Sequence, residues 1–133
     1  GLSYTTFDYS DFSLDKASRK GNLTISLTIT NSGSVAGREV VQIYVRKPNG
    51  DSLRPERELC AYAKTKLLAA GESQRVTIEI TADNLAQFDS EGACMKVAAG
   101  EYTLYASKDA LSPQQTLSHY VKRDIVTQKT HQQ

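Results

Sequence analysis

Tryptophan is absent from this sequence of 133 residues, and methionine, cysteine and proline are scarce, with one, two and three copies. No apolar run reaches the roughly 18–20 residues that a helix needs to span a bilayer. No segment indicates a cellular compartment, so the sequence assigns no location. With 39% hydrophobic and 23% charged residues, the composition is typical of a globular chain with the length of one domain.

An excess of either charge is also lacking. Sixteen basic and fifteen acidic residues leave a net charge of +1. Proteins that bind nucleic acid release counterions from it through a concentrated basic face. No such face is indicated, because the run RKPNGDSLRPERE mixes both signs. The sequence therefore argues against a nucleic-acid partner, and the missing apolar span argues against a membrane partner.

Groups that would perform catalysis or bind a metal are not indicated either. The sequence has no HExxH or CxxC motif and no glycine-rich loop that precedes a helix. Its two histidines, His119 and His131, stand in the terminal segment, which is a poor place for a general base. Among the acidic residues we expect Asp83 to cap a short helix and Asp89 to hold the following loop. We expect no catalytic residue, no cofactor and no metal.

The two cysteines, Cys60 and Cys94, leave two interpretations open. Their wide separation excludes a zinc site, which needs close pairs of Cys or His. Either both are small buried hydrophobes, or they form a disulfide between neighbouring strands with Cα atoms roughly 4.4–6.8 Å apart.

The dominant pattern in the sequence is an alternation of apolar and polar residues. In residues 23–30 (LTISLTIT), Leu or Ile alternates with Thr or Ser, which predicts a strand with one apolar face. Six further segments are predicted as strands on weaker or similar alternation: 5–9 (TTFDY), 40–46 (VVQIYVR), 58–67 (ELCAYAKTKL), 75–81 (RVTIEIT), 101–107 (EYTLYAS) and 114–121 (QQTLSHYV).

Turn residues separate these segments and indicate the fold class. In residues 31–37 (NSGSVAG) we expect Gly33 and Gly37 to adopt backbone conformations that β-branched residues cannot reach. Residues 81–92 (TADNLAQFDSEG) predict one or two helical turns. The pattern predicts an all-β fold, a seven-stranded antiparallel β-sandwich of the fibronectin type III-like (immunoglobulin-like) class, with one short helical turn. We place this sandwich at 1–121 and expect a frayed C-terminal tail at 122–133.

Two of the seven tyrosines are candidates for a contact surface. Tyr44 and Tyr105 fall on the face opposite the aliphatic residues of their strands, so their rings are expected to face outward. Exposed aromatic rings can contact either a sugar or another protein surface. The pattern leaves this choice open.

Four blocks of the sequence resemble a known family. Residues 1–10, 28–45, 54–73 and 97–110 are similar, in the same order, to the C-terminal fibronectin type III-like domain of glycoside hydrolase family 3, which includes β-glucosidases and β-xylosidases. The sequence departs from the family pattern at Met95, where the family commonly has Trp, and at Ala70 and Ala99, where it commonly has Pro.

The resemblance implies a non-catalytic accessory domain. In this family the aspartate nucleophile and the acid/base carboxylate belong to the preceding barrel and α/β sandwich domains, so no catalytic role is carried over to these positions. The parent would be a retaining β-glycosidase. A periplasmic or secreted location would fit such a parent, although the sequence itself assigns none. We expect the domain to pack on the two catalytic domains, with Arg54, Arg57, Tyr44 and Tyr105 as contact residues. A carbohydrate-binding module and a dimerisation or adhesion module are the alternatives.

Overall fold

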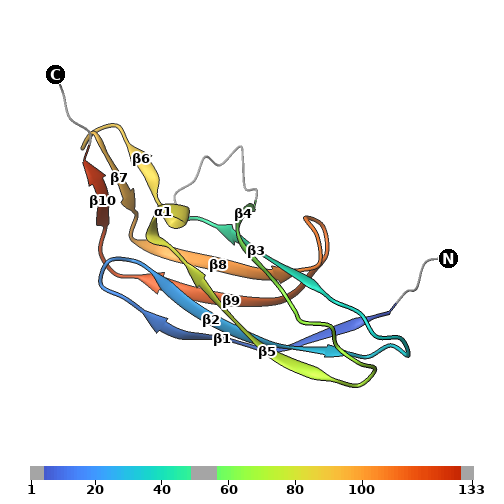
Figure 1. Cartoon of the computed structure of the whole chain (residues 1–133). Coiled ribbons are helices and arrows are strands. Elements are labelled where there is room, and N and C mark those ends of the chain that lie inside the picture. The colour runs from blue at the N-terminus through green and yellow to red at the C-terminus, as the bar shows by residue number, and fades with distance from the viewer. Residues whose placement is uncertain (1–4, 49–56, 130–133) are drawn as a thin grey trace.

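The structure, a computed structural model, describes residues 5–48 and 57–129. Its two main sheets are antiparallel and pack face to face (Figure 1). The first sheet has the order β1-β2-β5 and contains β1 (Phe7–Ala17), β2 (Leu23–Asn31) and β5 (Ser73–Ile80). The second sheet has the order β4-β3-β8-β9 and contains β3 (Val40–Arg46), β4 (Glu58–Lys64), β8 (Gly100–Ser107) and β9 (Pro113–Val121).

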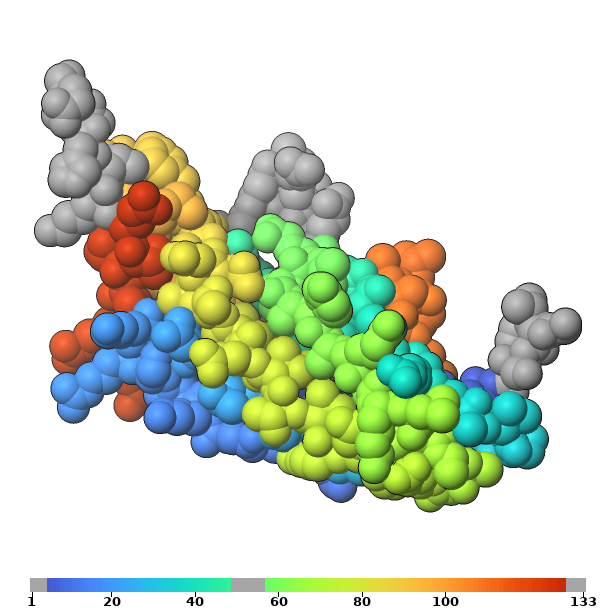
Figure 2. All heavy atoms as spheres, in the orientation of Figure 1, coloured from blue at the N-terminus to red at the C-terminus, as the bar shows by residue number. Residues whose placement is uncertain are grey.

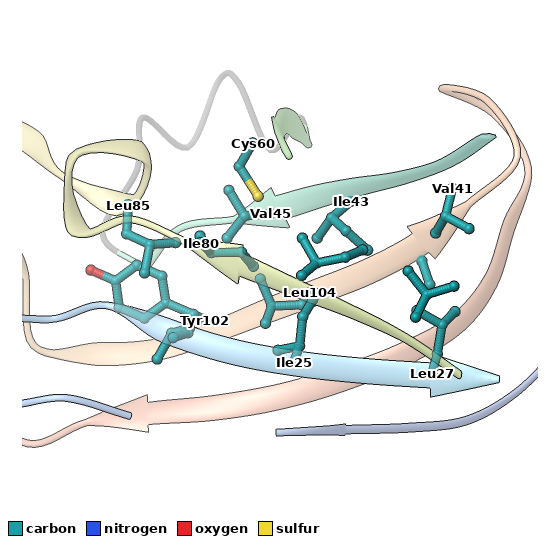
Figure 3. Packing of buried hydrophobic residues seen from close by; sticks show 14 of the residues in the cluster. Ile25, Leu27, Val41, Ile43, Val45, Cys60, Ile80, Leu85, Tyr102 and Leu104 are labelled. Carbon is teal, nitrogen blue, oxygen red and sulfur yellow. The ribbon is translucent and has the colours of Figure 1, made fainter. Parts of the chain in front are cut away.

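Each of the seven strands of these two sheets overlaps a segment that the alternation predicts, although β1 continues to Ala17, well beyond the predicted segment 5–9. Ile25, Leu27 and Ile29 of β2 are fully buried, as are Ile43 and Val45 of β3. Figure 3 shows how Ile25 and Leu27 of β2 meet the side chains of the opposite sheet, with Tyr102 and Leu104 of β8 between the layers. Because a strand directs alternate side chains to opposite faces, one apolar stripe per strand supplies one half of the core. The predicted seven-stranded sandwich is confirmed.

A third, small sheet lies at one end of the sandwich and was not predicted (Figure 1). Its order is β10-β7-β6, with β6 (Gln87–Asp89), β7 (Cys94–Val97) and β10 (Ile125–Lys129). The prediction of a frayed tail at 122–133 is wrong for residues 125–129, which pair with β7 from Ile125 opposite Val97 to Lys129 opposite Cys94. These strands are only three to five residues long, too short to give a periodic signal.

The single helical turn lies where the sequence predicts it, but its cap differs. Helix α1 (Ala82–Leu85) is followed by the short strand β6. The side chain of its N-cap residue, Thr81, forms no capping hydrogen bond. The side-chain oxygen of Asn22 accepts a hydrogen bond of 2.8 Å from the Ala82 amide instead. The predicted cap, Asp83, stands inside the first turn, so that prediction is wrong. A distant residue on the β1–β2 turn does the work of a local cap.

The reason for two glycines in the turn 31–37 also differs from the prediction. Positive φ angles occur at Gly21, Gly71 and Gly100 among the described glycines, and not at Gly33 or Gly37. A Cβ atom on Gly37 would lie 2.7 Å from the Cγ2 of Thr5, and one on Gly33 would lie 2.9 Å from the Thr6 amide nitrogen. The turn therefore needs glycine because the segment that leads into β1 passes close to it.

Both cysteines are free and buried, which confirms the first of the two interpretations. Cys60 faces the core from β4, and Cys94 begins β7. Burial, which disfavours the thiolate, raises the pKa of Cys60 to about 12. A thiol of this kind is inert at neutral pH and acts as a small apolar side chain.

Candidate functional site: the outer face of the four-stranded sheet

The two predicted contact tyrosines lie side by side on the outer face of the four-stranded sheet. Tyr44 of β3 is directly opposite Tyr105 of β8, and both side chains are half-buried. Their neighbours along each strand are buried aliphatic residues, so the prediction that both rings face away from the core is confirmed. The register continues the row across all four strands: Leu59, Tyr44, Tyr105 and Thr116.

Arg57 covers one of these rings. Its guanidinium carbon lies 5.0 Å from the centroid of the Tyr105 ring, within the range of a cation–π interaction. A guanidinium N–H of Arg57 also donates to the carbonyl of Ala110 at 3.3 Å. Within the described residues no carboxylate forms an ion pair with Arg57. The contact with the Tyr105 ring and the bond to Ala110 thus hold the guanidinium in place.

Tyr44 is also engaged within the face. Its hydroxyl donates a hydrogen bond of 2.6 Å to the side-chain oxygen of Gln42, two residues earlier on β3. A ring that stacks on a sugar needs an open face, and here Tyr105 lies under Arg57 while Tyr44 is only partly accessible. Neither ring of this pair is therefore fully open for such stacking. More exposed tyrosines of the same sheet are Tyr62 and Tyr120, at 71% and 65%.

The described residues that follow β3 and those that begin β4 are held by contacts with each other and with the segment around β6. The Lys47 ammonium donates to the Ala86 carbonyl at 2.9 Å and forms an ion pair of 3.3 Å with Glu58. Next to it, the side-chain amide of Gln87 donates to the Pro48 carbonyl at 3.2 Å. Arg54, the remaining predicted contact residue, lies outside the described residues. Nothing in the sequence pattern indicated the Lys47 anchor, because its partners are distant in the chain.

A second polar cluster links the small sheet together. The ammonium of Lys96 lies 2.8 Å from Asp124 and 3.3 Å from Asp89, and the other Asp124 oxygen accepts from the Ala99 amide at 2.8 Å. The bonds to Lys96 lower the pKa of both carboxyls. Asp89 also accepts from the Glu91 amide, so the prediction that it holds the following loop is confirmed. Hydrogen bonds from their partners also lower the pKa values of Asp15, Glu72 and Asp109. A lowered pKa keeps a carboxyl ionised, whereas a general acid needs a raised pKa.

A groove runs along the side of the sandwich where the outer strands of the two sheets meet. It has a volume of about 510 Å³ and lies between β4 and β5, with Asn84 of α1 at one end. The side-chain amide of Asn84 donates to the Cys60 carbonyl at 2.7 Å. Figure 2 shows this side of the molecule, with β4 in green and β5 in yellow-green. Within the described residues no cluster of His, Cys, Asp and Glu suits a metal ion, and no helix is long and apolar enough to cross a membrane.

Comparison with known proteins indicates where such a domain occurs. Residues 39–110 match the family described as the fibronectin type III-like domain. The chain is 35% identical to a β-glucosidase of Ruminococcus albus over 137 aligned residues, which cover 99% of this chain and 14% of that protein. A segment with 60% of this chain is 46% identical to a probable β-glucosidase I of Aspergillus terreus.

Solved structures give the same result. The structure superposes on β-glucosidase 3B of Thermotoga neapolitana with a TM-score of 0.83 and 36% identity, covering 96% of this chain and 17% of that one. A family 3 β-glucosidase of Bifidobacterium adolescentis gives a TM-score of 0.79 at 28% identity. The chain thus spans only 14–15% of the length of the first curated relatives that it matches.

Proposed function

The chain belongs to the fibronectin type III-like domain family, and on that premise we propose that it is an accessory domain of a family 3 β-glucosidase. In this proposal it packs against the catalytic domains of the same longer chain and holds them in their relative positions. The observation that carries the proposal is the coverage. Nearly the whole chain superposes on a β-glucosidase, but it accounts for 17% of that enzyme.

The parent chain, in this proposal, hydrolyses β-linked glucosides or xylosides by the retaining mechanism. Two carboxylates perform this chemistry, one as nucleophile and one as acid and base. Both belong to the remainder of the parent. The relatives are named β-glucosidases and, in one case, a putative β-xylosidase, which supports gluco- or xylo-configured substrates.

The outer face around Tyr44, Tyr105 and Arg57 is the surface that we assign to the contact between domains. Stacking on the Tyr105 ring already orders the Arg57 guanidinium in the free domain. Less side-chain entropy is therefore lost when a contact with a partner forms. Leu59, 54% exposed, extends this face with apolar surface. Central aromatic and arginine residues of this kind are frequent among those that dominate protein contacts.

Removal of the domain from the full-length enzyme tests this function. We expect the truncated enzyme to melt at a lower temperature and to lose turnover, because the catalytic domains are no longer held together. In the full-length enzyme, Arg57→Ala should lower the melting temperature, whereas Arg19→Ala, at an exposed arginine of the β1–β2 turn, should not. A truncated enzyme of unchanged stability and turnover would contradict the proposal.

Binding to carbohydrate and self-association are tested separately. Calorimetry of the isolated domain with β-glucan and xylan should give no heat if Tyr44 and Tyr105 serve a protein contact. Light scattering of the same domain measures its mass and reports dimerisation.

A further inference from the structure

Among the described residues, β4 is the edge strand of the sandwich whose central part has neither a charge nor a proline. In an antiparallel sheet an edge strand presents unpaired backbone groups, and proteins protect such edges with charges, proline or covering segments. β1 carries Asp8, Asp15 and Lys16, and β5 carries Arg75 and Glu79. β9 begins with Pro113 and lies against β1. The central residues of β4, Leu59–Ala63, contain neither a charge nor a proline.

The side chains of β4 add apolar surface to this edge. Tyr62 is 71% exposed and Leu59 is 54% exposed, while Ala61 and Ala63 are half-buried beside the core. Charges stand only at the ends of the strand, at Glu58 and Lys64. An exposed apolar strand edge is an aggregation hazard in a free domain, and a neighbour that covers it removes the hazard.

The groove next to β4 has the shape and lining for an extended segment. One wall is formed by residues 59–63 of β4, and the other by Thr77, Ile78 and Glu79 of β5. The apolar wall therefore faces a wall that offers hydroxyl and carboxylate oxygens. A segment with apolar side chains on one face and uncharged or basic polar side chains on the other would satisfy both walls, and a strand presents its side chains in this way.

We propose that this groove and the edge of β4 bind an extended, alternating segment of the adjoining domain in the same longer chain. The inference rests on the proposed function and adds to it the surface that the partner covers. Two observations favour a partner within the same chain. The aligned part makes up only 14–15% of the length of the first two matched relatives, so most of the polypeptide of such a protein lies outside it. A tethered segment also binds at a high effective concentration, so a small contact is enough.

The bulge in β4 limits how a second copy of the domain, or any other strand, can pair with this edge. The register of β4 against β3 shifts between Ile43 and Tyr44, where Cys60 is the extra residue on β4. A two-fold pair of β4 strands centred on Cys60 would bring two such bulges together, and Asn84 already occupies the Cys60 carbonyl. Backbone pairing with a partner is thus confined to residues 61–64, while side-chain contacts extend to Leu59.

Hydrogen exchange of the β4 amides in the isolated domain and in the full-length parent chain tests the proposal. Amides of residues 61–64 that point to the free edge should exchange at least about tenfold more slowly in the full-length chain. The amides of β9, the other edge of the same sheet, serve as the internal reference. Equal exchange of β4 in the two proteins would overturn the proposal.

A matched pair of variants gives a second readout. Tyr62→Lys and Tyr120→Lys each place a charge at an exposed tyrosine of the same sheet. Both should shift the melting temperature of the isolated domain by less than about 2 °C, because neither ring is part of the core. In the full-length chain only Tyr62→Lys should accelerate β4 exchange and lower the melting temperature. Equal effects of the two variants would contradict the proposal.

The remaining outcomes separate this inference from the function on which it rests. If removal of the whole domain destabilises the enzyme but Tyr62→Lys does not, the accessory function stands and the assigned groove is wrong. If removal of the domain has no effect, the accessory function itself fails. Sedimentation of the isolated domain completes the test, since a dimer that Tyr62→Lys abolishes would identify a second copy as the occupant and overturn the proposal.

Discussion

Asn31 and Leu68 are 37 residues apart in the chain and are joined by a hydrogen bond of 2.9 Å from the Asn31 side-chain amide to the Leu68 carbonyl. The same amide donates to the Val35 carbonyl, and the side-chain oxygen accepts from the Thr5 hydroxyl and the Gly33 amide. Asn31 is completely buried. One side chain at the end of β2 therefore connects the approach to β1, the turn 31–37 and the segment before β5.

Replacement of Asn31 by Ala should be among the more damaging single substitutions. It would leave several buried amide and carbonyl groups without partners, and each such group carries a desolvation penalty. We expect the free energy of unfolding, measured by urea titration, to fall by about 2–4 kcal/mol. Gln114→Ala, at an exposed side chain with one local hydrogen bond, is the control and should change it by less than about 0.5 kcal/mol. Similar losses in both variants would show that the connections of Asn31 are not important.

Gly37 should be intolerant of a side chain because of Thr5, and this cause can be isolated. The Cβ of Gly37→Ala would lie 2.7 Å from the Thr5 Cγ2, so we expect a loss of about 1–3 kcal/mol. Thr5→Ser removes Cγ2 but retains the hydroxyl that bonds to Asn31. In that background the loss from Gly37→Ala should shrink by about 1 kcal/mol or more in a double-mutant cycle.

Gly71 provides the contrast, since nothing lies within 4 Å of its Cβ position and its φ angle is +82°. Gly71→Ala should cost about 1–2 kcal/mol through backbone strain alone. Thr5→Ser should leave this loss unchanged. If Thr5→Ser relieves neither substitution, or both equally, contact with Thr5 is not the reason for glycine at position 37.

His119 should make the domain less stable as the pH falls from 7 toward 5. The side chain is partly buried on β9, and burial lowers its pKa below the ordinary value of 6.5. Below pH 6.5 the unfolded chain takes up a proton that the folded domain resists, so folding is progressively disfavoured until the pH falls below the pKa of the folded state. For one proton the slope is at most about 1.4 kcal/mol per pH unit.

Urea titrations of the wild type and of His119→Gln between pH 5 and 8 check this dependence. The slope between pH 5 and 6.5 should be smaller in the variant, while above pH 7.5 the two slopes should agree. Carboxyls such as Asp15 and Asp89 have lowered pKa values and contribute only below their ordinary value of about 4. Identical slopes would mean that the folded domain protonates His119 freely.

The main sheets were predictable because their information is local. In residues 23–30 each apolar residue has a polar neighbour, and the alternation fixes both the strand and its buried face. Burial of the aliphatic side chains then follows from sheet packing. The outward placement of Tyr44 and Tyr105 was predictable for the same reason.

Features that depend on distant partners were not predictable. Asn22 as the cap of α1, Thr5 as the cause of Gly37, and Lys47 as the anchor of Ala86 are contacts between segments far apart in the chain. Strand β10 has no clear alternation and gains its partners from β7. A single sequence carries no signal for such contacts, because any residue with a suitable donor or acceptor could make them.

Lys96 should hold β10 in the small sheet. Its ammonium joins Asp89 at the end of β6 to Asp124, the residue before β10, and Asp124 in turn accepts from the Ala99 amide. In Lys96→Met we expect the amides of residues 125–129 to exchange about tenfold faster, since β10 is a short strand at the edge of the small sheet. The β2 and β3 amides should exchange as in the wild type. Lys108→Met, at an exposed lysine of the β8–β9 turn, is the matched control and should leave β10 unchanged.

Acid should have the same local effect as Lys96→Met. Bonding to Lys96 lowers the pKa of Asp89 and of Asp124, so this contribution is complete at neutral pH and is lost as the pH falls through the pKa values of the folded state, below the ordinary 3.8. The protection of β10 in the wild type should therefore approach that of Lys96→Met as the pH falls through these lowered pKa values, after correction for intrinsic exchange. If β10 remains protected in the variant at neutral pH, the strand is held by its ladder to β7 and by the Thr127 hydroxyl that donates to the Met95 carbonyl, and not by the ion pairs.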